Sequence, residues 1–121
     1  MIRSTGNNQR YAAIDLGTNT CLLLVTRWAG TQFIPLAQEL RVVRLGAGVD
    51  RIGRLSEEAM DRAVAAFEEY QDIIESYSCS KVRCVATSAF REAANHEELH
   101  QRIMEATGYD LVQISGREEA E

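Results

Sequence analysis

The sequence predicts an α/β fold, a mixed sheet with helices packed on it, in the element order β-β-β-α-β-α-β. Three observations lead to this prediction. Apolar runs separated by short turns fill the first part of the chain, as in an antiparallel meander. A long stretch then carries apolar residues at three- and four-residue intervals, which indicates an amphipathic helix. Later apolar runs are joined through a second helical stretch, and such helical crossovers connect parallel strands.

The first part of the chain is expected to form the meander. Residues 1–10 are polar and lack periodicity, so we interpret them as a flexible tail before a single lobe over residues 11–121. Three strands are predicted, at about Arg10–Asp15, Thr20–Trp28 and Gln32–Val43. Pro35 has no backbone N–H, which restricts its part of the third strand to an edge or a bulge of the sheet.

A long helix follows the meander. Ser56 is a good N-cap, two glutamates come directly after it at the positive end of the helix dipole, and apolar residues from Met60 to Tyr77 recur on one face. We expect this helix to run for about six turns. Lys81–Thr87 is the next predicted strand, and the chain leaves it through a short helical turn that ends at Ala94.

The last elements are a shorter helix and a short strand. Asn95 is predicted to cap the helix, with Glu98 three residues later as in a capping box, and Gly108 to end it. Leu111–Ile114 is the final predicted strand, and Ser115–Glu121 turns into a further helix.

Composition excludes several classes of protein. The chain has 121 residues, 45% hydrophobic and 26% charged, which is ordinary for one soluble globular domain. Its net charge of −5 argues against a general affinity for nucleic acid or for an anionic membrane. The apolar runs are too short to span a bilayer and no leader precedes them, so we expect a cytoplasmic protein.

The cysteines and histidines carry no metal signal. Cys21 and Cys84 lie in apolar strand-like runs, where a thiol acts as a small hydrophobe, and Cys79 completes an odd number without a CxxC pair. His96 and His100 are four residues apart on a predicted helix, a spacing that allows metal ligation. Since no third ligand is near, we expect these histidines on a solvated helix face.

The turn between the first two strands is the first candidate site. Gly17, Thr18, Asn19 and Thr20 would present backbone N–H groups and hydroxyls at its tip, and such a concavity suits an anion. Asp15 stands at the end of the first strand, and a carboxylate beside a phosphate requires a hard cation such as Mg²⁺ between them. The residues therefore predict a phosphate site with Asp15 as metal ligand. An ordinary hairpin turn remains open, because the same residue types are common in turns.

Two further segments are expected at the same edge, because ligands collect outside the carboxyl ends of parallel strands. Thr87-Ser88 with Arg91 follows one strand, and Ser115-Gly116 with Glu118 and Glu119 follows the last. Arg91 could clamp a phosphate bidentately, and Glu118 or Glu119 could act as a general base on water. A surface arginine and an acidic cluster at a helix start are the simpler interpretations of these residues.

Leu45–Asp50 forms a glycine-containing loop between the meander and the long helix. Gly46 and Gly48 could approach a phosphate closely, or they could simply permit the chain to turn. Of these two interpretations we favour the turn.

Five motifs occur in order along the chain, at Ala13–Thr20, Arg44–Gly48, Leu55–Met60, Val85–Ala93 and Ile114–Ala120. Through them the chain resembles, from about Tyr11 to Ala120, the exopolyphosphatase and guanosine-pentaphosphate phosphohydrolase (Ppx/GppA) family. That family is a branch of the actin-like ATPase superfamily with a ribonuclease-H-like fold. The first motif occurs in loose form throughout the superfamily, whereas the five together are specific.

The resemblance implies an enzyme that releases terminal orthophosphate from inorganic polyphosphate or guanosine pentaphosphate, with Mg²⁺. It implies that Gly17–Thr20 is the first phosphate loop, that Arg91 binds phosphate and that Glu119 is the catalytic base. Glu121 departs from the family pattern, in which an arginine often follows Glu-Glu-Ala. We also expect a homodimer at full length, and no nucleic-acid or membrane partner.

Family members continue into a second lobe with another phosphate loop, of the Asp-x-Gly-Gly-Gly-Ser type, which is absent from this sequence. We therefore expect the chain to be the N-terminal lobe alone, with little or no phosphatase activity by itself. Two other functions stay open: a kinase or ATPase of the same superfamily, and a non-catalytic lobe that binds polyphosphate or the alarmone nucleotide. The Glu-Glu-Ala and Thr-Ser-x-x-Arg segments favour the phosphatase.

Overall fold

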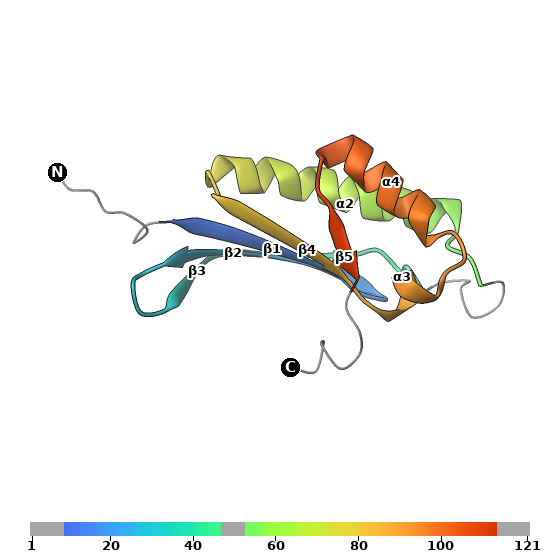
Figure 1. Ribbon diagram of the computed structural model, residues 1–121, viewed down its shortest axis with the longest axis horizontal. Coiled ribbons are helices and arrows are strands. Elements are labelled where there is room, and N and C mark those ends of the chain that lie inside the picture. Colours follow the sequence, from blue (N-terminus) through green and yellow to red (C-terminus); the bar gives the residue numbers. More distant parts are fainter. Residues whose placement is uncertain (1–8, 47–52, 114–121) are drawn as a thin grey trace.

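The computed structural model describes residues 9–46 and 53–113, which form two layers: a five-stranded sheet and two helices, α2 and α4, on one of its faces (Figure 1). The elements in chain order are β1 (Arg10–Leu16), β2 (Thr20–Trp28), β3 (Phe33–Val42), α2 (Glu57–Ser76), β4 (Lys81–Ala86), α3 (Ser88–Glu92), α4 (His96–Thr107) and β5 (Leu111–Gln113). The predicted α/β class and element order are confirmed, with α3 as the short helical turn. Residues 1–8 of the predicted tail and the helix predicted in Ser115–Glu121 lie outside the described residues.

The sheet joins an antiparallel half to a parallel half. Its strand order is β3-β2-β1-β4-β5. The pairs β1–β2 and β2–β3 are antiparallel, whereas β1–β4 and β4–β5 are parallel, as the meander and the helical crossovers predict. Pro35 lies in the edge strand β3, and the register shifts opposite it, between Val25 and Thr26. The missing N–H of proline is thus accommodated both by an edge position and by a bulge.

Side chains along β1 point alternately to a buried face and to an exposed face of the sheet. Ile14 and Leu16 are fully buried beneath the helices, while Ala13 and Asp15 point to the opposite face and are exposed. In the described part of the chain, both long helices lie on the same side of the sheet, and only the short α3 stands at its right-hand end in Figure 1. Asp15 therefore lies on the open face, next to the edge where β1 ends.

Helix α2 begins and packs as the sequence predicts. The Ser56 hydroxyl oxygen accepts a hydrogen bond from the Ala59 amide at 3.0 Å, which is an N-cap. Phe67 and Tyr70 are fully buried against the sheet, and the Tyr70 hydroxyl donates to the Cys21 carbonyl oxygen at 2.6 Å. This bond ties the middle of α2 to the start of β2. No helix of residues 9–46 and 53–113 is long and apolar enough to cross a membrane.

The predicted capping box of α4 is wrong. Asn95 occupies the N-cap position, but its side chain makes no capping hydrogen bond. Instead its amide group bridges both backbone groups of Leu55, accepting from the Leu55 N–H at 2.8 Å and donating to the Leu55 carbonyl oxygen at 3.0 Å. Glu98 binds Arg102 at 2.6 Å rather than reaching back to the N-cap. Gly108 ends the helix in the left-handed conformation, as predicted.

Candidate active site at the carboxyl edge of the sheet

The turn between β1 and β2 is a tight hairpin over Gly17–Thr20. Its ends are closed by the Gly17 amide, which donates to the Thr20 carbonyl oxygen at 2.9 Å. A Cβ at Gly17 would lie 3.2 Å from that same oxygen, so glycine suits the close approach. Thr18 and Asn19 form the exposed tip. The hairpin is confirmed, phosphate binding by it stays a prediction, and we name Gly17–Thr20 the phosphate turn after that prediction.

Asp15 lies close to this turn but not directly before it. Strand β1 extends one residue beyond the predicted end, to Leu16, whose side chain points into the core. Asp15 therefore projects from the opposite face, and its register neighbours are Leu22 on β2 and Val85 on β4. Its position is exposed, and its role as a metal ligand stays a prediction.

The end of β4 is joined to the end of β1 by Thr87. The Thr87 amide and hydroxyl both donate to the Leu16 carbonyl oxygen, at 3.1 and 3.4 Å. The Thr87 hydroxyl oxygen also lies 3.9 Å from the place where a Cβ of Gly17 would stand. Helix α3 starts directly after Thr87 and carries Arg91, which is half-buried and whose amide donates to the Thr87 carbonyl oxygen at 3.2 Å. The predicted proximity of this segment to the turn is thus observed.

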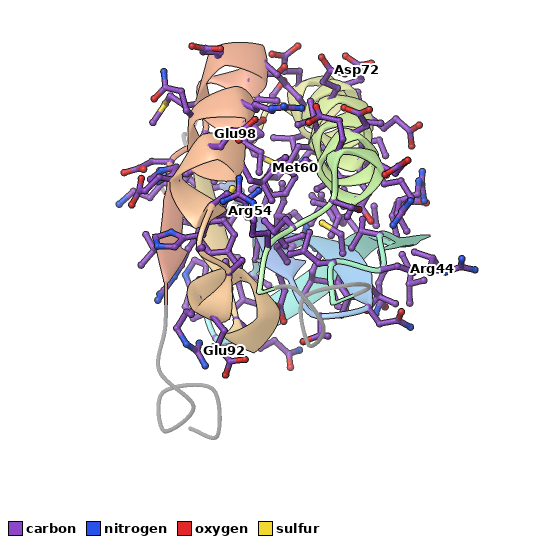
Figure 2. All side chains as sticks on the ribbon, turned by 90° about the vertical axis from the view of Figure 1, so that its right-hand side faces the viewer. Arg44, Arg54, Met60, Asp72, Glu92 and Glu98 are labelled. Carbon is purple, nitrogen blue, oxygen red and sulfur yellow. The ribbon has the colours of Figure 1, made fainter. Side chains whose placement is uncertain are left out.

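Strand β5, which precedes the third predicted segment in the sequence, ends at the same edge. Leu16 of β1 pairs with Ala86 of β4, and Ala86 pairs with Gln113 of β5, so the three parallel strands end level with one another. Figure 2 looks at this end of the molecule, with α3 in tan in front of the strand ends. Glu118 and Glu119, the two candidate bases, lie outside the described residues.

Sequence reasoning missed one part of this edge. The segment Val43–Gly46, which we name the bracing segment, packs against the phosphate turn, and the Gly46 amide donates to the Thr18 carbonyl oxygen at 3.0 Å. The available signal was the motif Arg44–Gly48, in which we favoured a plain turn. Gly46 instead makes a close approach to another loop. Gly48 lies outside the described residues.

Cys21 and Cys84 do not supply a nucleophile. Cys21 and Cys84 are buried, as predicted, and burial is the main cause that raises the pKa of each thiol to about 12. For Cys21 the neighbouring Cys84 and the Asp15 carboxylate raise the pKa further, and for Cys84 the Asp110 carboxylate does so. Because the thiolate is the reactive form, both side chains act as core residues.

The two histidines, predicted on a solvated face of α4, are partly exposed and also contact neighbouring elements. Both are half-buried: the His100 Nε2 lies 2.8 Å from Asp110 Oδ1, and the His96 ring meets the Phe90 ring edge-on at 5.3 Å. They join α4 to β5 and to α3. Among the residues that the structure describes, no three His, Cys, Asp or Glu side chains form a group that could hold a metal ion.

Comparison with known proteins places this arrangement in a family. The model of the Ppx/GppA phosphatase family matches residues 24–121. The chain belongs to the Ppx/GppA phosphatase family. A guanosine-5'-triphosphate,3'-diphosphate pyrophosphatase of Vibrio vulnificus (strain YJ016) is 36% identical over 115 residues, which are 95% of this chain and 23% of that relative.

Solved Ppx/GppA structures share the fold. The crystal structure of the Aquifex aeolicus family member superposes with a TM-score of 0.89 at 28% identity, over 92% of this chain and 36% of that one. An exopolyphosphatase from Cytophaga hutchinsonii gives a TM-score of 0.89 at 36% identity, over 93% of this chain and 36% of that one. The predicted ribonuclease-H-like, actin-like ATPase type of fold is therefore confirmed. The chain spans about a quarter of the curated relative and little more than a third of these two solved chains.

Proposed function

We propose that this chain is part of a phosphohydrolase that, at full length, releases terminal orthophosphate from a linear phosphate chain, either inorganic polyphosphate or guanosine pentaphosphate. The observation that carries the proposal is the level ending of the three parallel strands at Leu16, Ala86 and Gln113. Neighbouring strands lie about 4.8 Å apart, so the ends of β1 and β5 lie roughly 10 Å from each other. One phosphate chain can contact all three segments.

Each segment has a role in this proposal. The phosphate turn holds phosphate oxygens through its backbone N–H groups and threonine hydroxyls, and Arg91 binds the same anion. Glu119, a few positions after Gln113, takes a proton from water while the water oxygen attacks the terminal phosphorus. The bond from that phosphorus to the bridging oxygen breaks, the shortened chain keeps the bridging oxygen, and orthophosphate leaves.

A divalent cation such as Mg²⁺ fits the donors at this edge. Asp15 offers a carboxylate, a hard oxygen ligand, and the phosphate held by the turn offers further oxygen ligands. Mg²⁺ is commonly held by one or two carboxylates together with substrate phosphates rather than by a cage of protein ligands. This agrees with the lack of a three-ligand cluster in residues 9–46 and 53–113. When bound, the ion would neutralise charge on the phosphate oxygens.

The names of two relatives support the two proposed substrates, guanosine pentaphosphate and inorganic polyphosphate. The curated Vibrio vulnificus relative is named for a guanosine nucleotide, and the Cytophaga hutchinsonii structure is named an exopolyphosphatase. Their shared chemistry is hydrolysis of a phosphoanhydride bond, and the experiment below therefore includes both substrates.

The decisive experiment uses the full-length protein and measures orthophosphate release from each substrate with Mg²⁺. Glu119→Gln should lower kcat by a factor on the order of 10² to 10⁴ without changing the unfolding midpoint. Glu118→Gln removes the same charge one position earlier and should cost much less. Glu92→Gln is the matched control, because this carboxylate lies at the same edge but points outward from α3 (Figure 2). Near-normal turnover of Glu119→Gln would remove that residue from the base role.

The same assay separates the other functions. The present chain without further polypeptide should release little or no orthophosphate, and turnover equal to that of the full-length protein would contradict the need for a second lobe. Preferential hydrolysis of ATP would indicate a kinase or ATPase. Binding of tripolyphosphate without its hydrolysis would indicate a non-catalytic lobe. The homodimer remains a proposal, which light scattering on the full-length protein tests.

A further inference from the structure

The phosphate turn is held by three backbone hydrogen bonds from the bracing segment. The amides of Val43 and Arg44 both donate to the Asn19 carbonyl oxygen, at 2.9 and 3.0 Å. The Gly46 amide donates to the Thr18 carbonyl oxygen at 3.0 Å. Both carbonyl groups at the tip of the turn therefore face the bracing segment.

This orientation also sets the direction of the N–H groups. A trans peptide carries its C=O and its N–H on opposite sides, and the described residues include no cis peptide bond. Since the Thr18 and Asn19 carbonyls face the bracing segment, the N–H groups of Asn19 and Thr20 point away from it. These N–H groups are among the donors that the proposed function assigns to phosphate.

At Gly46 the two segments approach too closely for a side chain. A Cβ there would lie 2.7 Å from the Thr18 Cγ2, whereas carbon atoms are already in contact at about 3.5–4.0 Å. Gly46 is not among the glycines with positive φ, so it is required here for space and not for an unusual backbone conformation. An alanine would strike this methyl group and force the Thr18 side chain, at the tip of the turn, to move.

Arg62 of α2 fastens the bracing segment to the body of the fold. Its Nε donates to the Val43 carbonyl oxygen at 2.8 Å, and its Nη2 donates to the Arg44 carbonyl oxygen at 3.4 Å. Arg44 has a φ of 49°, a left-handed conformation that is uncommon for residues other than glycine. The guanidinium thus binds the two carbonyl groups that flank the unusual residue and stabilises the bend that brings Gly46 to the turn.

We propose that Gly46 and Arg62 are positioning residues for phosphate binding, an inference that rests on the proposed function. Gly46 lets the bracing segment reach the phosphate turn, and Arg62 holds that segment on α2. The N–H groups of the turn then face the phosphate before it binds, so binding requires no reorganisation of the backbone. Neither residue contacts the substrate in this arrangement; both act through the turn.

The test compares variants of the full-length protein by KM, kcat and unfolding midpoint. Gly46→Ala should raise KM about tenfold, and Arg62→Met should raise it by a smaller factor, because the phosphate donors are misdirected. Arg62→Lys keeps a cationic donor and should recover part of the loss. The matched control is Arg10→Met, which removes an Nη1 bond of 3.1 Å to the Tyr77 carbonyl oxygen at the other end of β1. A residue with a purely structural role lowers the unfolding midpoint but not the affinity for substrate. The proposal would therefore be overturned if Gly46→Ala and Arg62→Met had the same KM as Arg10→Met.

A double variant tests the contact itself. Thr18→Ser removes the Cγ2 that an alanine at position 46 would strike and keeps the hydroxyl. The KM of the double variant Gly46→Ala/Thr18→Ser should therefore be close to that of Thr18→Ser alone. If the two substitutions instead multiply their effects on KM, the two residues act independently and the proposed clash is wrong.

Failure of the proposed function is recognisable in the same set of proteins. If the unmodified full-length protein releases no orthophosphate from either substrate, the phosphohydrolase proposal fails, and calorimetric titration with tripolyphosphate and Mg²⁺ then tests the positioning role. The Kd of Gly46→Ala should be about tenfold higher than that of the unmodified protein, in line with the KM expected above. Equal Kd values, or no binding by the unmodified protein, would overturn the positioning role.

Discussion

Replacing Asn95 gives the sharpest test of how the helices are joined. The Asn95 side chain is buried and bridges the N–H and the carbonyl group of Leu55, at 2.8 and 3.0 Å. Leu55 directly precedes the N-cap of α2, while Asn95 is the N-cap residue of α4. One amide side chain therefore links the starts of the two long helices. The neighbouring Ala94 amide adds a backbone bond to the Gly53 carbonyl oxygen at 2.8 Å.

The expected loss of stability in Asn95→Ala follows from the two backbone groups of Leu55 that it leaves without a hydrogen-bond partner. Each of the two lost hydrogen bonds is worth about 1 kcal/mol net, and an unsatisfied buried group costs about 1–3 kcal/mol. Leu55 is only 3% exposed, so water reaches its backbone poorly. We expect the free energy of unfolding to fall by about 2–4 kcal/mol, which is a large fraction of the stability of a domain this size.

Asn95→Asp tests the direction of the two bonds. An ionised carboxylate still accepts from the Leu55 N–H, but it faces the Leu55 carbonyl oxygen with no hydrogen between them. Burial raises the pKa of the introduced carboxyl group above its usual range, and the protonated form can donate to that carbonyl. The folded variant thus holds its proton more tightly than the unfolded one. Its stability relative to the unmodified protein should therefore rise as the pH falls from about 7 to about 5.

Urea unfolding followed by circular dichroism measures these differences, with the unmodified protein at each pH as reference. Asn95→Ser is the matched control, because serine is a good N-cap but cannot bridge both groups of Leu55. It should be almost as unstable as Asn95→Ala. A fully stable Asn95→Ser would mean that the residue acts as a helix cap after all. A loss below about 1 kcal/mol in Asn95→Ala would refute the bridge.

Three further changes test other parts of the fold. Tyr70→Phe removes the 2.6 Å bond from the buried hydroxyl to the Cys21 carbonyl oxygen and should cost about 1–2 kcal/mol in urea unfolding; an unchanged midpoint would contradict its anchoring role. Iodoacetamide at about pH 8 should label the half-buried Cys79 of the folded protein and spare Cys21 and Cys84, whose pKa burial raises to about 12, until urea unfolds it. Mass spectrometry of digests reads the labels, and rapid labelling of all three thiols would refute the burial. Gly108→Ala forces a side chain into a φ of 79° and should cost about 1 kcal/mol, although no atom lies within 4 Å of the added carbon; equal stability would show that the helix end adjusts.

The boundaries of the elements could be predicted because they depend on near neighbours. Thr20–Trp28 was located at its observed bounds, since an apolar run between two turns has few alternatives. Ser56 and Gly108 act as cap and terminator through contacts within one helical turn. Pro35 was assigned to an edge or a bulge from the missing N–H alone, and both are observed.

The candidate site could be predicted only in part. The topology implied by the helical crossovers was enough to expect the phosphate turn and the Arg91 segment at one edge. Glu119 stays a prediction, because it lies outside the described residues. The contact of Gly46 with Thr18 was missed, although both residues were singled out, because nothing in the spacing of two loops tells how closely they approach.

By itself, therefore, the sequence determined the kinds of element, their order and the residue types gathered at the edge of the sheet. The tertiary structure decided the partners: Asn95 bonds to Leu55, forty residues away, rather than to its own helix, and His100 contacts Asp110. Local sequence patterns reflect backbone sterics and hydrogen bonds within a few residues, and these interactions do not depend on the rest of the chain. Strand register and helix packing arise only when distant segments meet, and they set which polar groups remain unsatisfied and must find one another.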